Sequence, residues 1–323
     1  MVQASSYRLF ALFALILVSG CTSIERLALP DAVLGDAYWE RYDASSQAAI
    51  DHAPLQAFLD RYVATDTSGV NRVDYGAVNA DDRADLKRYL TDLQVAPIHQ
   101  YRRAEQLAFW VNLYNAKTVD IVLDHYPVDT IRDIKLGSGL IVVGPWGAPV
   151  LQVSGRYLSL NDIEHMIIRP VWQDERIHYV LNCAAAGCPN LSRQAYQGWN
   201  IDAAMTAAAE AYVNDPRGVR IDEQGKLRLS KIYGWFREDF GGDQRSVIGA
   251  VSRYAAPALK ADLAKRQRID RYGYDWALND AKSEATPLTA RSSPTLDQRP
   301  DAQPDVSPDS ALSVASTAGS TVR

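Results

Sequence analysis

The clearest periodic pattern in the chain lies between residues 107 and 122. Side chains suited to a buried face recur there every three or four positions: Leu107, Trp110, Val111, Tyr114, Thr118, Ile121 and Val122. Residues at this spacing lie on one face of an α-helix. The pattern predicts a long helix with a broad buried face that ends before Pro127.

Weaker patterns predict the elements around this helix. Further helices are expected over residues 45–64, 81–93, 201–213, 233–240 and 246–265, with an extended piece over 71–78. Hairpins are expected from 140–143 with 150–153 and from 219–222 with 227–232. Ser159 and Asp162 have the spacing of a capping box for a short helix, 160–168, which Pro170 should stop. This mixture predicts a single α+β domain.

One short apolar run stands out because it precedes a cysteine. The sequence IHYVLNC, residues 177–183, is rich in β-branched and aromatic side chains and has little polarity. It predicts a strand buried on both faces. The strand would lead into the loop 184–191, which contains Gly187, Cys188 and Pro189.

The first residues have the pattern of an export signal. Arg8 is followed by an apolar run, residues 9–18, and by small Ser19 and Gly20 before Cys21. The run is too short for a permanent transmembrane helix. Residues 18–21 resemble a bacterial lipobox, which implies lipidation of Cys21 and attachment to the membrane through acyl chains. We expect a signal peptide over 1–20 and a lipid-anchored protein, with Thr22 favouring the outer membrane facing the periplasm.

The composition along the chain sets the limits of the folded part. Residues 283–323 are Pro, Ser, Thr, Ala and Asp with almost no large apolar side chains, so we expect a disordered tail. Residues 21–44 are expected to form a lipidated tether, which leaves 45–282 as the domain. The net charge is −5 and basic residues form no block, so nucleic acid is excluded as an expected partner.

Four segments together resemble a known family. They are AFWVNLYNA (108–116), LSLNDIEHMIIRP (158–170), RIHYVLNCAAAGCPNL (176–191) and LSKIYGWFREDFG (229–241). In this order they resemble the family called domain of unknown function 547, over residues 69–241. The resemblance implies a fold likened to papain-like thiol hydrolases, in a permuted order, and no settled activity.

Cys183 and Cys188 are the two cysteines that lipidation leaves free. A structural disulfide is expected in an oxidising compartment, and Gly187 and Pro189 suit the tight loop that it needs. Cys183 is equally a candidate nucleophile, because it lies where a predicted strand ends. Zinc ligation is the weakest alternative, since the spacing C-x4-C departs from the usual C-x2-C. We therefore expect no metal and no cofactor.

A nucleophilic cysteine needs a base, and spacing sorts the five histidines. On an extended strand His178 and Cys183 would be about 16 Å apart and on opposite faces. His178 is therefore expected to pack in the core or to bond a neighbouring element. His165 lies on the capped helix and is the candidate base, with a surface histidine as the alternative.

Two asparagines complete the hypothesis. Asn115 lies at the rim of the buried helix face and is the candidate to orient His165, or else it bonds a backbone group in the core. Asn182, beside Cys183, is a candidate oxyanion donor.

These residues predict a Cys-His hydrolase or acyltransferase acting on an amide or ester bond. Two other functions remain open. One is a non-catalytic envelope protein with a Cys183–Cys188 disulfide, and the other is a thiol-disulfide exchange protein.

Overall fold

The computed structural model describes residues 25–26, 29–138 and 141–281. The expected signal peptide, Cys21 and the expected tail from residue 283 lie outside the described residues. All described residues belong to one compact unit, 1–291. Within it, helices and four small sheets mix along the chain, which confirms the α+β class.

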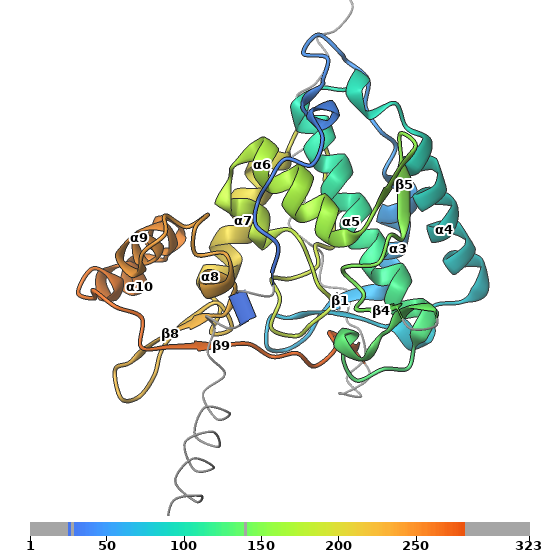
Figure 1. Ribbon diagram of the computed structural model, residues 1–323. Coiled ribbons are helices and arrows are strands. Elements are labelled where there is room, and N and C mark those ends of the chain that lie inside the picture. The colour runs from blue at the N-terminus through green and yellow to red at the C-terminus, as the bar shows by residue number, and fades with distance from the viewer. Residues whose placement is uncertain (1–24, 27–28, 139–140, 282–323) are drawn as a thin grey trace, which may run out of the picture. The chain divides into compact units, whose positions relative to one another are not determined.

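Helix α5 (Arg103–His125) runs through the middle of the fold (Figure 1). It contacts α4 (Ala80–Val95), α7 (Ile201–Val213) and the helical segment η5 (Asp162–Ile168). Every residue from 105 to 116 is buried, so the expected buried face extends around the whole helix in this stretch. The predicted helices 107–122, 81–93 and 201–213 are confirmed.

Proline residues explain two errors in the predicted helices. Residues 45–52 are not helical, and α3 (Ala53–Tyr62) begins only where Pro54 occupies its first turn. The helix expected over 246–265 is two helices, α9 (Gln244–Tyr254) and α10 (Pro257–Leu263). Pro54 suits the first turn of α3, where its missing N–H would have no helical partner. Ala256, which precedes Pro257, has φ −57° and ψ 155° and lies outside the helical region, as the clash with a following proline requires. The helix expected over 233–240 ends early, as α8 (Ile232–Trp235).

Each described sheet is small. The antiparallel pairs are β1 (Val63–Thr65) with β2 (Asn71–Val73), β3 (Leu136–Ser138) with β4 (Ile141–Val143), and β5 (Leu151–Val153) with β6 (Arg156–Leu158). In the three-stranded sheet, β7 (Val219–Ile221) pairs antiparallel with β8 (Leu227–Ser230), as predicted. β9 (Arg271–Gly273) then adds parallel to β8.

The hairpin expected between 140–143 and 150–153 is wrong. β5 pairs instead with β6, the strand that follows it, across a two-residue turn. Ser154 and Gly155 in that turn have φ values of 51° and 78°. Positive φ at both central residues is the geometry that matches the twist of paired strands, so the local turn decides the pairing.

The strand expected over 177–183 is also wrong. Residues 175–179 form the 3₁₀ turn η6 (Glu175–Tyr179), capped by the Asp174 side chain, and the chain is irregular from there to Cys183. The run is buried from Ile177 to Asn182, which accounts for its apolar character. Burial alone cannot distinguish a helical turn from a strand in so short a run. Because this segment is not an extended strand, His178 and Cys183 are not held on opposite faces of one.

The capping box is present, and the helix after it has an unusual register. Ser159 and Asp162 exchange hydrogen bonds of 2.8 and 3.1 Å between side chain and backbone N–H. The helix then widens into a π-helix, η5, in which Arg169 N–H bonds to the Glu164 carbonyl. It continues through Pro170 as α6 (Arg169–Trp172), so the expected stop at Pro170 is wrong. The remaining short turns are η1 (Ala37–Glu40), η2 (Tyr75–Ala77), η3 (Ile98–Gln100) and η4 (Ile131–Asp133).

The described part of the expected tether packs on the domain. Val33 N–H and Gly35 N–H donate to the carbonyls of His165 and Met166, and Glu25 bonds to Lys231. The buried side chains form two cores, one around α3, α4, α5 and η5, and one around β7, β8 and α9. The site described next lies where the two cores meet.

Candidate functional site

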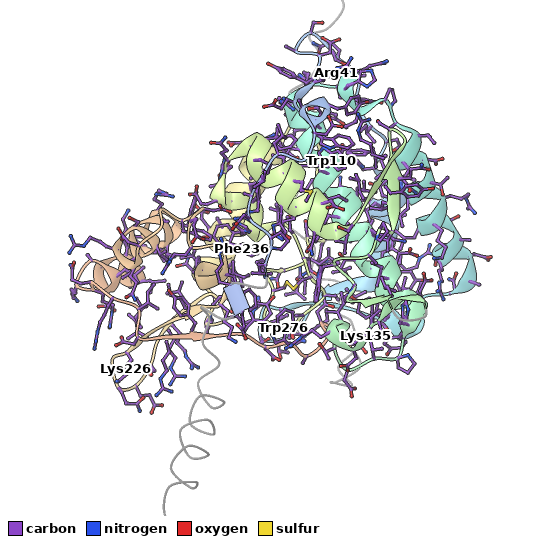
Figure 2. The ribbon with its side chains drawn as sticks, in the orientation of Figure 1. Arg41, Trp110, Lys135, Lys226, Phe236 and Trp276 are labelled. Atoms are coloured by element: carbon purple, nitrogen blue, oxygen red, sulfur yellow. A yellow bond between two sulfur atoms is a disulfide. The ribbon has the colours of Figure 1, made fainter. Side chains whose placement is uncertain are left out.

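A cavity of about 350 Å³ lies between the two cores and collects most of the candidate residues. Its wall is largely apolar and includes the aromatic residues Phe236 and Trp276, both labelled in Figure 2. The lining comes from segments far apart in the chain: Leu29, Pro30, Tyr114, Gly144, Trp146, Gly147, Asn161, Glu164, His165, His178, Leu181, Cys183, Cys188, Ile232, Trp235, Phe236, Tyr274 and Trp276. Tertiary packing therefore unites Cys183, His165 and His178 in one cavity.

Cys183 and Cys188 are joined by a disulfide on this wall. Cys183 is partly exposed, whereas Cys188 is buried. The Tyr274 hydroxyl lies 3.0 Å from Cys183 Sγ and 3.1 Å from Cys188 Sγ. Burial raises the pKa of Tyr274 well above its usual value, so its phenol stays protonated and can donate to either sulfur.

The loop between the cysteines is held by its own backbone and by Asn182. Ala184 has a φ of 59°, a left-handed conformation. The Asn182 side chain accepts from Ala184 N–H at 2.9 Å and donates to the Pro189 carbonyl at 2.8 Å. Asn182 does not line the cavity, so its amide serves the loop and is not presented to a ligand as an oxyanion donor would be.

His178 lines the cavity and lies between two carboxyl groups, those of Asp239 and Glu164. Its Nε2 lies 2.7 Å from Asp239 Oδ2, and its Nδ1 lies 3.8 Å from Glu164 Oε1. The ring stacks on Phe236 with 4.2 Å between centroids. The expectation that His178 packs in the core and bonds a neighbouring element is confirmed.

The pKa values of Asp239 and Glu164 are shifted in opposite directions. Burial raises the pKa of Asp239, but hydrogen bonds from His178 and Arg169 outweigh it and hold the pKa well below its usual range. Burial dominates at Glu164 and raises the pKa of its carboxyl, against the opposing charges of His178 and Arg169. Tyr114 donates to Glu164 Oε2 at 3.2 Å. Carboxyl groups with divergent pKa values around one histidine are typical of sites that move protons.

His165 lines the cavity in a form that suits donation more than proton abstraction. Arg169 donates from its guanidinium to His165 Nδ1 at 3.1 Å. A guanidinium cannot accept, so the hydrogen of the neutral ring is on Nε2. Burial and the nearby Arg169 charge lower the pKa of His165 to about 3, which makes it a weak base.

Asn115 is not brought to the cavity. Its side chain donates to the Val180 carbonyl and accepts from Asn182 N–H, both at 2.8 Å, inside the core. This is the alternative in which the amide bonds backbone groups. The structure therefore places Asn115 behind the cysteine loop and apart from His165.

Several wall residues could not be assigned from the sequence. Tyr274 and Trp276 lie beyond the recognised segments, and neither spacing nor composition marks them. The site also depends on Glu164 and Asp239, which no sequence pattern places beside His178.

The comparisons with known proteins agree with the recognised segments only in part. Residues 98–213 match a family model described as "Protein of unknown function, DUF547". The DUF547 match is narrower than the expected 69–241. It includes Glu164, His178 and both cysteines of the site but not Asp239 or Tyr274. No curated protein and no solved structure matches the chain.

The described residues show neither a metal site nor a membrane-spanning helix. No group of three or more His, Cys, Asp or Glu side chains there is arranged to hold a metal ion. No described helix is long and apolar enough to cross a membrane.

Proposed function

We propose that the DUF547 stretch belongs to a cysteine-dependent acyl-transfer enzyme, a hydrolase or acyltransferase that acts on an amide or ester bond. The observation that supports this most directly is that one cavity is lined by Cys183, His178 and Glu164. The disulfide form holds Cys183 inactive, and a dithiol reductant releases it as the nucleophile.

Cys183 is the nucleophile because it is the partly exposed cysteine, whereas Cys188 is buried. Only the thiolate attacks efficiently, so the site must lower the pKa of the thiol. The Tyr274 hydroxyl, 3.0 Å from Cys183 Sγ, is a donor that stabilises a thiolate.

His178 is the base, in place of the expected His165. Its Nε2 donates to the Asp239 carboxylate, which leaves Nδ1 as the unprotonated nitrogen of the neutral ring. Asp239 stabilises the imidazolium after His178 has taken the thiol proton. The order of the groups along the chain is immaterial, because such sites are defined by geometry. The likeness to a permuted papain fold remains a prediction.

The chemistry then follows in two steps. The Cys183 thiolate attacks the carbonyl carbon, the bond to nitrogen or oxygen breaks, and the imidazolium returns its proton to the leaving group. Water or an acceptor alcohol or amine then cleaves the thioester and restores the thiol. The aromatic wall, with Trp146, Trp235 and Trp276, suits an acyl group with a large apolar part.

A second candidate function is thiol-disulfide exchange. The unequal burial of Cys183 and Cys188 favours it, because an exposed attacking sulfur and a buried resolving sulfur are what exchange requires. In that case the disulfide is itself the reactive group and acyl chemistry is absent.

Labelling of the full chain in detergent tests the proposal. The chain is reduced with dithiothreitol, treated with iodoacetamide between pH 5 and 9, and analysed by peptide mass spectrometry. We expect Cys183 to react before Cys188, with an apparent pKa below the free-thiol value of about 8.5. The apparent pKa of the Cys183 thiol should be higher in a His178→Gln variant than in the native chain. It should be unchanged in the matched His165→Gln variant.

Activity separates the two candidates. The reduced chain should hydrolyse p-nitrophenyl esters with a burst of one acyl group, and the oxidised chain should not. Reduction of insulin disulfides without ester hydrolysis supports exchange. A Cys183 thiol with an ordinary pKa, in a chain that shows neither activity, contradicts both candidate functions. That result would favour a non-catalytic binding protein with a structural disulfide.

We also propose that the protein is lipid-anchored through Cys21 in the bacterial envelope, at the outer membrane and facing the periplasm. The support is the sequence of residues 18–21 and the small residues before the cysteine. Metabolic labelling with a palmitate analogue should mark the native chain and not a Cys21→Ala variant. Equal labelling of both would contradict the anchor.

A further inference from the structure

Three arginines lie side by side across the sheet β7–β8–β9. Arg220 of β7 is the register partner of Arg228 in β8, and Arg228 is the register partner of Arg271 in β9. Direct register partners have their side chains on the same face of a sheet, roughly 5 Å apart. The flanking Leu227 and Leu229 are buried on the other face, so the arginine row is on the outer face.

The acidic groups nearby do not balance this row. Arg228 pairs with Asp222 at 2.9 Å. Arg220 and Arg271 are exposed, and neither forms an ion pair with any acidic side chain in the described part of the chain. Like charges placed directly opposite each other destabilise a sheet, so the row favours a bound anion.

A second cavity of about 350 Å³ opens beside the row. It shares only Tyr274 with the first cavity. Its wall has four arginines and one carboxylate, Asp275, among these residues: Gly187, Pro216, Arg217, Arg220, Arg228, Leu229, Arg271, Tyr272, Gly273, Tyr274 and Asp275. The Arg217 guanidinium is already bound to Asp215, to Asn190 and to the carbonyls of Ala186 and Cys188. A ligand in this cavity would therefore contact the arginine row.

We propose that this cavity binds a ligand carrying phosphate groups. The guanidinium fork pairs with phosphate oxygens in a bidentate manner. Three forks in a row span roughly 10 Å, which suits two linked phosphates or a phosphorylated head group better than a single small anion. Strands β8 and β9, which carry Arg228 and Arg271, are labelled in Figure 1, and Lys226, in the turn that joins β7 to β8, is labelled in Figure 2.

Calorimetric titration of the full chain with inorganic pyrophosphate is the first arm of the test. The second arm measures binding to phosphatidylcholine vesicles with and without phosphatidylglycerol. The difference between the two vesicles removes any contribution of the apolar N-terminal run. Both arms compare the native chain with Arg220→Gln/Arg271→Gln.

A matched control removes two charges elsewhere. The variant Arg88→Gln/Arg245→Gln changes exposed arginines of α4 and α9, neither of which lines this cavity. Circular dichroism confirms that each variant is folded. We expect the row variant to weaken binding at least about tenfold, because hydrogen bonds between charged partners are lost, and the control to leave it unchanged.

The arms distinguish the source of the phosphate. Tight pyrophosphate binding that weakens with salt and in the row variant indicates a soluble ligand. Binding to the anionic vesicles alone, lost in the row variant, indicates a lipid head group. Absence of binding in both arms, or equal binding by the native chain, the row variant and the control, overturns the proposal.

Discussion

Val33 donates its backbone N–H to the carbonyl of His165 at 3.1 Å, across 132 residues of chain. The His165 carbonyl is available because Pro170, five residues later, has no N–H to close the π-helical bond. The Met166 carbonyl, four residues before Pro170, accepts from Gly35 in the same way at 3.2 Å. The N-terminal segment thus supplies donors to two neighbouring carbonyls that precede Pro170, in the helix beside the cavity.

A Val33→Pro substitution should therefore destabilise the domain. It removes the donor and leaves a buried carbonyl unpaired, which costs about 1–3 kcal/mol. Urea denaturation measures the change in the free energy of unfolding. Val33→Ala is the control, because the Val33 side chain is exposed. Equal stability of the two variants would show that the bond to His165 contributes nothing.

The disulfide should contribute a moderate part of the stability. The bridge closes a short loop, with a separation of five residues. Loop-closure entropy then gives about 2 kcal/mol in favour of the bridged chain. Cys183→Ser/Cys188→Ser should lower the free energy of unfolding by that amount without reductant. With dithiothreitol the native and double-variant chains should converge, and a gap that persists would argue against a bridge in the native protein.

The buried Glu164 carboxyl should make stability depend on pH. Burial raises its pKa in the folded state above the ordinary value of a glutamate. The group therefore favours folding below the unfolded pKa, and this contribution is lost as the pH rises through the folded pKa. Glu164→Gln keeps the shape and removes the titration.

The melting temperature of Glu164→Gln, relative to the native chain, should consequently rise between pH 4 and pH 8. The comparison cancels the titration of every other group that the substitution leaves alone. A difference in melting temperature that stays constant with pH would mean that the pKa of Glu164 does not change on folding.

Asn115 should matter for stability and only indirectly for chemistry. Asn115→Ala leaves Val180 O and Asn182 N–H without their partner in the core, which costs about 3 kcal/mol. Asn112 offers a matched control, since it bonds Tyr196 O at 2.7 Å and Tyr196 N–H at 3.0 Å in the same manner.

Both alanine variants should lower the urea midpoint to a similar extent. Only Asn115→Ala should also alter iodoacetamide labelling of Cys183, because only Asn115 holds the segment that precedes it. A stable Asn115→Ala variant with a lost activity would instead support the role of orienter for Asn115.

The elements that could be predicted are those whose signal is local. The helix around residues 107–122 repeats its apolar spacing over several turns, and the capping box needs only Ser159 and Asp162. The glycine at residue 155 also marks a turn at 154–155, which is consistent with the pairing of β5 and β6. The higher apolar content of residues 140–143 and 150–153 favours a different hairpin in the sequence, and that hairpin does not form. Long periodic signals average over many residues, whereas the pairing of short strands depends on the geometry of one turn.

The sequence by itself determined the α+β class and the long central helix. It also indicated two cysteines and a histidine as candidate site residues. Only the tertiary structure decided that His178 lies between Asp239 and Glu164. His178 belongs to a 3₁₀ turn, where the sequence predicts a strand. The tertiary structure also decided that Tyr274 reaches both sulfurs and that three arginines share one face of a sheet. Each of these juxtapositions joins residues far apart in the chain, and such contacts depend on the packing of whole elements, which no local pattern of residues encodes.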